Sequence, residues 1–172
     1  FSGNCLIEKS TGTLLMGIGD YTIPDDGSII NIGDGVFTNS SITNITVPDG
    51  VQIIGSKAFY GCNQLKSVKL PDSVITLGSQ AFLDCTSLTE VILPKGLKEI
   101  SNGLFWNCYA LEKIDIPETV EYIGDSAFIH CEALKSITIP EGVKLINYGT
   151  FEGCTELEEI RLPDKLESIE DY

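Results

Sequence analysis

Residues 111–131, with the sequence LEKIDIPETVEYIGDSAFIHC, hold the pattern that decides the fold. Apolar and polar side chains alternate up to a proline, which is typical of a half-buried strand that ends where the backbone N–H is missing. Gly124 then allows a tight bend. Ala127, Phe128 and Cys131 are spaced to lie on one side of a single helical turn. The segment therefore predicts a strand, a bend and a short helical turn.

The same pattern recurs along the whole chain with a period of 23 residues, and three residue types keep it. Prolines occupy Pro24, Pro48, Pro71, Pro94, Pro117, Pro140 and Pro163. Phenylalanines occupy Phe37, Phe59, Phe82, Phe105, Phe128 and Phe151. Cysteines occupy Cys62, Cys85, Cys108, Cys131 and Cys154. Units of this length cannot bury a core alone, but stacked copies share a continuous apolar column and pair their strands in parallel. We therefore predict an α/β solenoid with a parallel concave sheet and helical turns on its convex side.

The repeats occupy residues 21–172 as about six units of 23 residues, the last of them incomplete. Residues 1–20 break the period with two short apolar runs around Lys9–Gly12, which predicts a hairpin that caps the first coil. At the other end, residues 166–169 begin the second half of a seventh unit that lacks the Ala-Phe-x-x-Cys segment. We expect an uncapped end there, so that either the natural protein continues or a neighbouring molecule covers it, the second of which would be end-to-end self-association.

Composition limits the classes of partner. The 172 residues are 42% apolar, enough for one folded domain, and 11 Lys+Arg against 25 Asp+Glu give a net charge of −14. This charge opposes binding to nucleic acid or to anionic lipid, because both require clustered cations. No apolar run approaches the ~20 residues of a membrane-spanning helix. We expect neither nucleic-acid binding nor membrane insertion.

Five of the six cysteines share one position of the repeat, which raises the question of disulfides. Equivalent residues in stacked coils lie ~4.8 Å apart, but their Cα–Cβ bonds are parallel, whereas a disulfide needs Cβ atoms about 3.5–4.5 Å apart. We predict a column of buried free thiols, since unpaired cysteine behaves as a small core residue.

No constellation for catalysis or metal binding stands out. His130 adjoins Cys131, but that cysteine is one of five equivalents, and the position before it also holds Gly61, Asp84, Asn107 and Gly153. Paired Cys and His ligands at zinc spacing are missing, and the Asp- and Gly-containing segments fit turns better than calcium loops. We predict a protein that is not an enzyme, with no catalytic residue, cofactor or metal.

Two surfaces are candidates for binding. The first is the concave sheet, whose outward positions include Lys66, Lys69, Glu90, Ile92, Glu112, Lys113, Asp115, Lys135, Thr138, Glu159 and Arg161. The second is an apolar ridge on the convex side, formed by Tyr60, Leu83, Trp106 and Ile129. The alternative for these four residues is that they lie over the turns and shield the edge of the core.

The motifs Leu-x-x-Ile-x-Ile-Pro and Ile-Gly-x-x-Ala-Phe-x-x-Cys resemble the BspA-like, treponemal-type leucine-rich repeats of bacterial surface proteins, over about residues 20–169. Ser101 and Asn147 stand where that family prefers glycine, and Leu104 and Thr150 where it prefers alanine, which would weaken individual bends. The resemblance implies a right-handed leucine-rich-repeat solenoid of an exported or surface-anchored protein that adheres to host proteins or to other cells.

The function expected from the sequence is a non-enzymatic leucine-rich-repeat binding module of a bacterial cell-surface or secreted protein. Its ligand would be a protein or glycan, including host-derived ones, held on the concave sheet. The alternative is a structural spacer or self-assembling scaffold that displays other domains. Either role implies an extracellular or cell-surface location.

Overall fold

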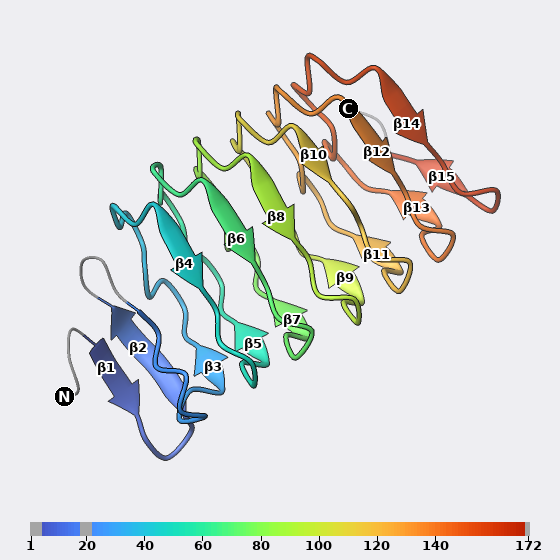
Figure 1. The fold of residues 1–172 in the computed structure, drawn as a ribbon. Helices are drawn as coiled ribbons and strands as arrows, with labels where there is room; N and C mark the ends of the chain where they lie inside the picture. The colour runs from blue at the N-terminus through green and yellow to red at the C-terminus, as the bar shows by residue number, and fades with distance from the viewer. Residues whose placement is uncertain (1–4, 18–21, 171–172) are drawn as a thin grey trace.

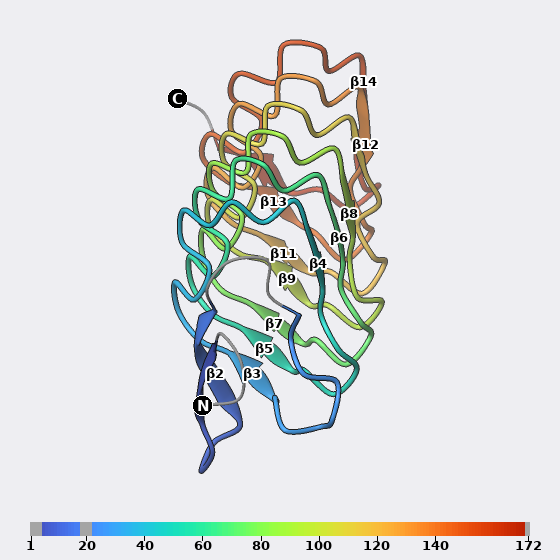
Figure 2. The same ribbon diagram turned by 60° about the vertical axis from the view of Figure 1, so that its left-hand side comes forward.

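A computed structural model describes residues 5–17 and 22–170, which form a solenoid of stacked coils (Figure 1). Most coils contribute two short strands, one on each of two sides of the array, as Figure 2 shows. The first side is a continuous six-stranded parallel sheet. Its strands are β4 (Asn44–Thr46), β6 (Ser67–Lys69), β8 (Glu90–Ile92), β10 (Lys113–Ile114), β12 (Ser136–Thr138) and β14 (Glu159–Arg161).

A second row of strands, which the sequence analysis missed, follows each proline turn. It consists of β3 (Asn31–Ile32), β5 (Ile53–Ile54), β7 (Thr76–Leu77), β9 (Glu99–Ile100), β11 (Tyr122–Ile123), β13 (Leu145–Ile146) and β15 (Ser168–Ile169). Each is only two residues long, too short for a period-2 pattern to reveal it. An antiparallel pair, β1 (Cys5–Glu8) and β2 (Thr13–Gly17), precedes this row, and β2 pairs in parallel with β3. Residues 1–4 and 18–20 of the predicted hairpin lie outside the described residues.

The core is a column of equivalent side chains from successive coils. Phe37, Phe59, Phe82, Phe105 and Phe128 are at most 1% exposed. Neighbouring rings, including that of Phe151, lie 5.1–5.7 Å apart between centroids and within 16° of parallel. Beside them, each repeated cysteine donates its thiol hydrogen to the phenylalanine carbonyl of the preceding coil, as Cys108 does to Phe82 at 3.2 Å. The column supplies the buried apolar surface that no coil could close alone.

The predicted helical turns are wrong, since no helix occurs in the described part of the chain. In the segment from Gly55 to Cys62, successive backbone N–H groups instead alternate between two kinds of hydrogen bond. Ala58 and Tyr60 bond locally to the third residue before them, whereas Lys57 and Phe59 donate to carbonyls of the next coil. A helix would use all of these N–H groups internally.

Left-handed backbone explains why this segment is not helical. Each coil has two residues with positive φ, four positions apart, for example Gln80 at 61° and Asp84 at 61°. The second position holds Asn39, Gly61, Asp84, Asn107, His130 and Gly153. Glycine, asparagine and aspartate tolerate this conformation best, so the composition of this position was the available signal against a helix.

Glycine at the bend after the second strand is required by close approach of two coils. A Cβ atom on Gly78 would lie 2.3 Å from the Ser56 nitrogen, and one on Gly124 would lie 2.7 Å from the Asn102 nitrogen. The backbone nitrogen of Gly78 donates to the Ile54 carbonyl of the preceding coil at 2.7 Å. The missing side chain therefore allows the coils to meet.

Ser101 and Asn147, which replace this glycine, interrupt the second row of strands. The Ser101 hydroxyl donates to the Leu77 carbonyl, and the Asn147 side-chain amide donates to the Ile123 carbonyl. Backbone pairing is missing between β7 and β9 and between β11 and β13 among the described residues. A side-chain bond thus replaces the backbone bond where Cβ separates two coils, as expected if these departures weaken individual bends.

We predict that Gly78→Ala lowers the free energy of unfolding by about 1–3 kcal/mol, because its Cβ must displace the backbone of the preceding coil. Gly78→Ser should cost less, since its hydroxyl can donate to the Ile54 carbonyl as Ser101 does to Leu77. Gly96→Ala is the matched control, because a Cβ there meets no atom within 4 Å. Urea denaturation of the three variants measures the series, and equal stability of Gly78→Ala and Gly96→Ala would contradict the argument.

Candidate functional site

The outward side chains of the first sheet form a candidate binding surface, called here the β4–β14 face. Within the strands, Val68, Val91 and Ile114 are buried in the core, so the residues on either side of each are directed outward. The exposed residue directly before each strand is counted with the face. The face comprises Thr43, Asn44, Thr46, Lys66, Ser67, Lys69, Thr89, Glu90, Ile92, Glu112, Lys113, Asp115, Lys135, Ser136, Thr138, Glu158, Glu159 and Arg161. All are exposed except Ser67, which is half-buried, so every predicted sheet residue reaches solvent.

Opposite charges balance on this face. It carries five cations, Lys66, Lys69, Lys113, Lys135 and Arg161, and five anions, Glu90, Glu112, Asp115, Glu158 and Glu159. The complete chain has 11 cations against 25 anions, so its entire excess of negative charge lies elsewhere. A partner that the rest of the surface would repel can approach the β4–β14 face without that penalty.

The sheet opens near its centre. Strand β10 pairs with β12 only at Lys113 and Ser136, whereas β12 pairs with β14 over three residues as far as Thr138 and Arg161. Because β10 ends at Ile114, the chain at Asp115 separates from the neighbouring strand. Two shallow depressions lie on either side of this segment, with volumes of about 530 and 320 Å³.

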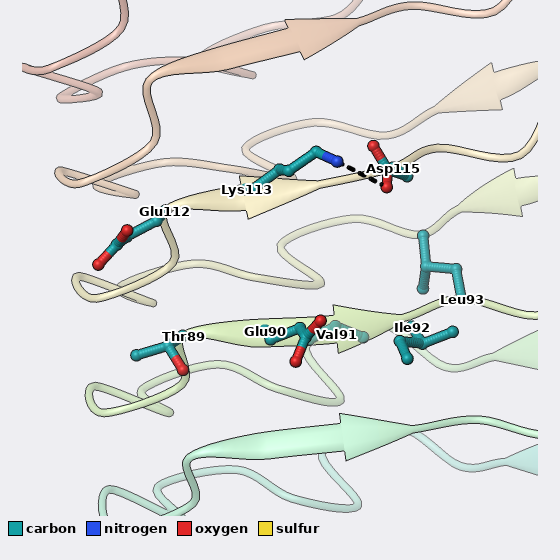
Figure 3. Close-up of a pocket in the computed structure, with 8 residues that line it drawn as sticks. All are labelled: Thr89, Glu90, Val91, Ile92, Leu93, Glu112, Lys113 and Asp115. Atoms are coloured by element: carbon teal, nitrogen blue, oxygen red, sulfur yellow. Dashed lines mark hydrogen bonds and ion pairs between the residues drawn. The ribbon is translucent and has the colours of Figure 1, made fainter.

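The larger depression lies between β8 and β10 and combines charged and apolar groups. Figure 3 shows Glu90 and Ile92 on β8 and the ion pair of Lys113 with Asp115 on the next coil. The Nζ of Lys113 lies 3.0 Å from Oδ2 of Asp115. Ile92 is the only apolar outward residue of the face and is 46% exposed. The depression therefore offers one apolar contact framed by groups of both signs.

Charged side chains two residues apart on one strand hold each other in place. Arg161 Nε lies 2.8 Å from Glu159 Oε1, and this hydrogen bond raises the pKa of Arg161. Both pairs on the face are exposed, so each contributes little to stability. Their main consequence is to orient the charges at fixed positions on paired strands.

The predicted apolar ridge is less exposed than the sheet. Tyr60, Leu83 and Trp106 are half-buried, and Ile129 is 7% exposed. Its role in association stays a prediction. Sequence reasoning missed three more exposed apolar residues near the second row of strands: Ile53 in β5, and Ile30 and Ile75 directly before β3 and β7. These strands are two residues long, too short to show an alternation of apolar and polar residues.

The five repeated cysteines are free; four are buried in the core, and Cys154 is half-buried against it. Burial raises the pKa of Cys62 and of Cys154 to about 11, and it raises the pKa of Cys108 and Cys131 further. Such thiols are protonated at neutral pH and make poor nucleophiles. The side chain of Cys5 lies outside the described residues.

Groups able to hold a metal ion, defined as three or more clustered His, Cys, Asp or Glu side chains, were not found within residues 5–17 and 22–170. A helix long and apolar enough to cross a bilayer is likewise missing from this part of the protein.

Stacked parallel strands, a phenylalanine column and a 23-residue period define a leucine-rich-repeat solenoid of the right-handed type. The sequence model of the BspA type leucine-rich repeat region matches residues 30–154 and 121–172 with six copies. The chain belongs to this family, as its motifs indicated. The fold generally mediates protein interactions, and its repeats are typically non-catalytic scaffolds.

Solved structures of bacterial leucine-rich repeat proteins resemble the chain. A Treponema pallidum protein is 30% identical with a TM-score of 0.88, covering 96% of this chain and 81% of that one. A Eubacterium ventriosum protein is 25% identical with a TM-score of 0.83, covering 96% and 48%. A protein from Faecalibacterium prausnitzii, described as a leucine-rich cell surface protein, is 27% identical with a TM-score of 0.58, covering 85% and 54%. The chain thus spans about half the length of the last two. A search of curated proteins found no match.

We predict that a thiol reagent at neutral pH reacts slowly with the buried cysteines of the folded protein and labels about six thiols after denaturation, which matches the six cysteines.

The thiols also predict a pH dependence of stability. Because the pKa of Cys62 rises from 9.0 to about 11 on folding, the folded state keeps a proton that the unfolded state has lost. The free energy of unfolding should therefore fall as pH rises from about 9 toward about 11. Rapid labelling of Cys62, Cys85, Cys108 or Cys131 in the folded protein, located by mass spectrometry, would show that these thiols are not buried.

Proposed function

We propose that the chain is a non-enzymatic binding module that recognises a protein partner through the β4–β14 face. The observation that carries this proposal is the balance of five cations and five anions on that face of a protein with a net charge of −14. A surface without selection for contact would be expected to share the acidic excess. Balanced charge on a partner-facing surface avoids repulsion and provides specificity through complementary pairs.

Rigidity of the sheet supports the same role. The charged side chains project from strands in parallel register, so little backbone entropy is lost when they meet a partner. Ile92, beside the opening at β10, is the best candidate for the centre of the contact, because interface energy concentrates in desolvated central residues ringed by polar ones. The concave shape predicted for this sheet would place Ile92 and its neighbours around a convex partner.

The proposed setting is a bacterial cell-surface or secreted protein engaged in adhesion. Membership of the BspA-type family supports it, and so does the Faecalibacterium prausnitzii relative, which is described as a cell surface protein. A net charge of −14 also suits a soluble, non-aggregating surface module.

A second candidate role is end-to-end assembly as a spacer. Ile160, Leu162 and Ile169 of the last coil are 41–58% exposed, whereas Ile137, Ile139 and Ile146, their equivalents one coil earlier, are at most 5% exposed. A further coil would cover this apolar surface, whether it comes from a second copy of the protein or from the same chain beyond residue 172. Light scattering over a range of concentrations distinguishes the two roles, because the average molar mass should increase with concentration only if the protein self-assembles.

The binding role can be tested with immobilised extracellular-matrix and bacterial surface proteins by surface plasmon resonance. We expect Ile92→Glu and the charge reversal Lys113→Glu each to weaken binding at least about tenfold, because both alter the centre of the face. Ile75→Glu is the matched control, since Ile75 is 59% exposed but lies outside the face. Unchanged affinity in both face variants, or equal loss in the control, would contradict the proposal.

A further inference from the structure

A third depression, with a volume of about 370 Å³, lies on the turn segments that follow β7, β9 and β11 in the chain. It shares no lining residue with the two depressions on the β4–β14 face. Residues of three successive coils line it, among them Gln80, Asn102, Gly103, Trp106, Asp125 and Ser126. Its volume falls in the roughly 300–1,000 Å³ range of small-ligand sites.

A buried glycine lies among the residues that line the depression. Gly103 belongs to a column of residues with positive φ, in which Lys57, Gln80 and Ser126 all carry side chains. A Cβ on Gly103 would lie 3.2 Å from Cγ of Gln80 and 3.6 Å from Cε3 of Trp106. Gln80 and the indole ring therefore pack closely over Gly103, and a side chain there would enter the space that they line.

This combination breaks the repeat at one coil. The position three residues after Gly103 holds Trp106, and its equivalents are Thr38, Tyr60, Leu83, Ile129 and Glu152. The other glycines of the Gly103 column, Gly35 and Gly149, are followed by Thr38 and Glu152 rather than by an aromatic residue. Among these six equivalent segments, only one thus combines a glycine with an aromatic residue three positions later.

Polar side chains around the ring are available to a ligand. The side chains of Gln80, Asn102, Asp125 and Ser126 form no hydrogen bond or ion pair with any other described residue. Elsewhere on the turn side comparable groups do bond to each other, as Asn107 Nδ2 does to Asp84 Oδ1 at 2.7 Å. Two amides, a hydroxyl and a carboxylate therefore provide both donors and acceptors around one apolar ring.

We infer that this depression binds a neutral pyranose unit of a glycan. The C–H face of a pyranose packs against an aromatic ring, while its hydroxyls require closely spaced donors and acceptors, and Trp106 with its polar rim supplies both. Asp125 is the charged residue among those that line the site, and the chain carries a net charge of −14, so an anionic sugar is disfavoured. This site lies outside the β4–β14 face and goes beyond the proposed protein-binding role.

Trp106 reports on its own site, because it is the single tryptophan of the chain. The complete chain is titrated with glucose, galactose, mannose and N-acetylglucosamine and with their disaccharides, while the tryptophan emission is followed. Mannitol, which has the hydroxyls but no ring, and glucuronate, which has the ring and a negative charge, are the control probes. We expect a saturable change in emission with at least one neutral sugar, no change with mannitol, and at least tenfold weaker binding of glucuronate.

Variants distinguish sugar binding at this depression from a nonspecific change in tryptophan emission. Gly103→Gln fills the depression with a side chain that the same column already carries at Gln80, and it should abolish the response. Asn102→Ala should weaken binding about fivefold through a lost hydrogen bond. Ser56→Ala, two coils earlier at the position equivalent to Asn102, is the matched control and should leave binding unchanged.

A response to none of the neutral sugars would overturn the inference, and so would an equal response in Gly103→Gln. If Gly103→Gln fails to fold, as judged by circular dichroism, Asn102→Ala against Ser56→Ala decides the question alone. Protein binding by the β4–β14 face should survive in Gly103→Gln, so failure of the sugar site and failure of the proposed function are distinguishable.

Discussion

The contact between equivalent side chains of neighbouring coils is the constraint on which this protein depends. Phenylalanine rings stacked 5.1–5.7 Å apart match the separation of about 4.8 Å that hydrogen-bonded strands require, so one coil spacing satisfies both the core and the backbone. Every other feature must fit into that spacing. A side chain is tolerated at a given position only if the equivalent residue of the neighbouring coil leaves room for it.

The glycine bends show how strictly this spacing applies. Where Gly55, Gly78 and Gly124 occur, the coils approach closely and the second row of strands pairs. Where Ser101 and Asn147 occur, pairing is lost, but each side chain bonds to the carbonyl that the backbone would have used. The first sheet stays continuous past these interruptions. Local weakness on one side therefore leaves the β4–β14 face intact as a rigid platform.

Features that depend on the period could be predicted from the sequence, whereas features that depend on the path of the backbone and on the fit of neighbouring coils could not. The phenylalanine column and the exposed sheet residues follow from spacing alone. The helical turn at Ala127–Cys131 was wrong, because apolar spacing describes which side chains face the core but not which carbonyl each N–H reaches. The depressions beside Asp115 and Gly103 depend on strand separation and on neighbouring coils, so no single repeat revealed them.

Departures from the repeat fall into two kinds. At Ser101 and Asn147 the new polar group is buried and hydrogen-bonded within the protein. This side-chain bond compensates for the backbone bond that is lost at the same position. At Ile92 and Trp106 an apolar side chain occupies an outward or surface position, and the polar rim of Trp106 makes no compensating internal bond. Ile92 is 46% exposed and Trp106 is half-buried, so both leave apolar surface in contact with solvent. Burial of these two apolar surfaces by a partner molecule would therefore contribute to the free energy of binding.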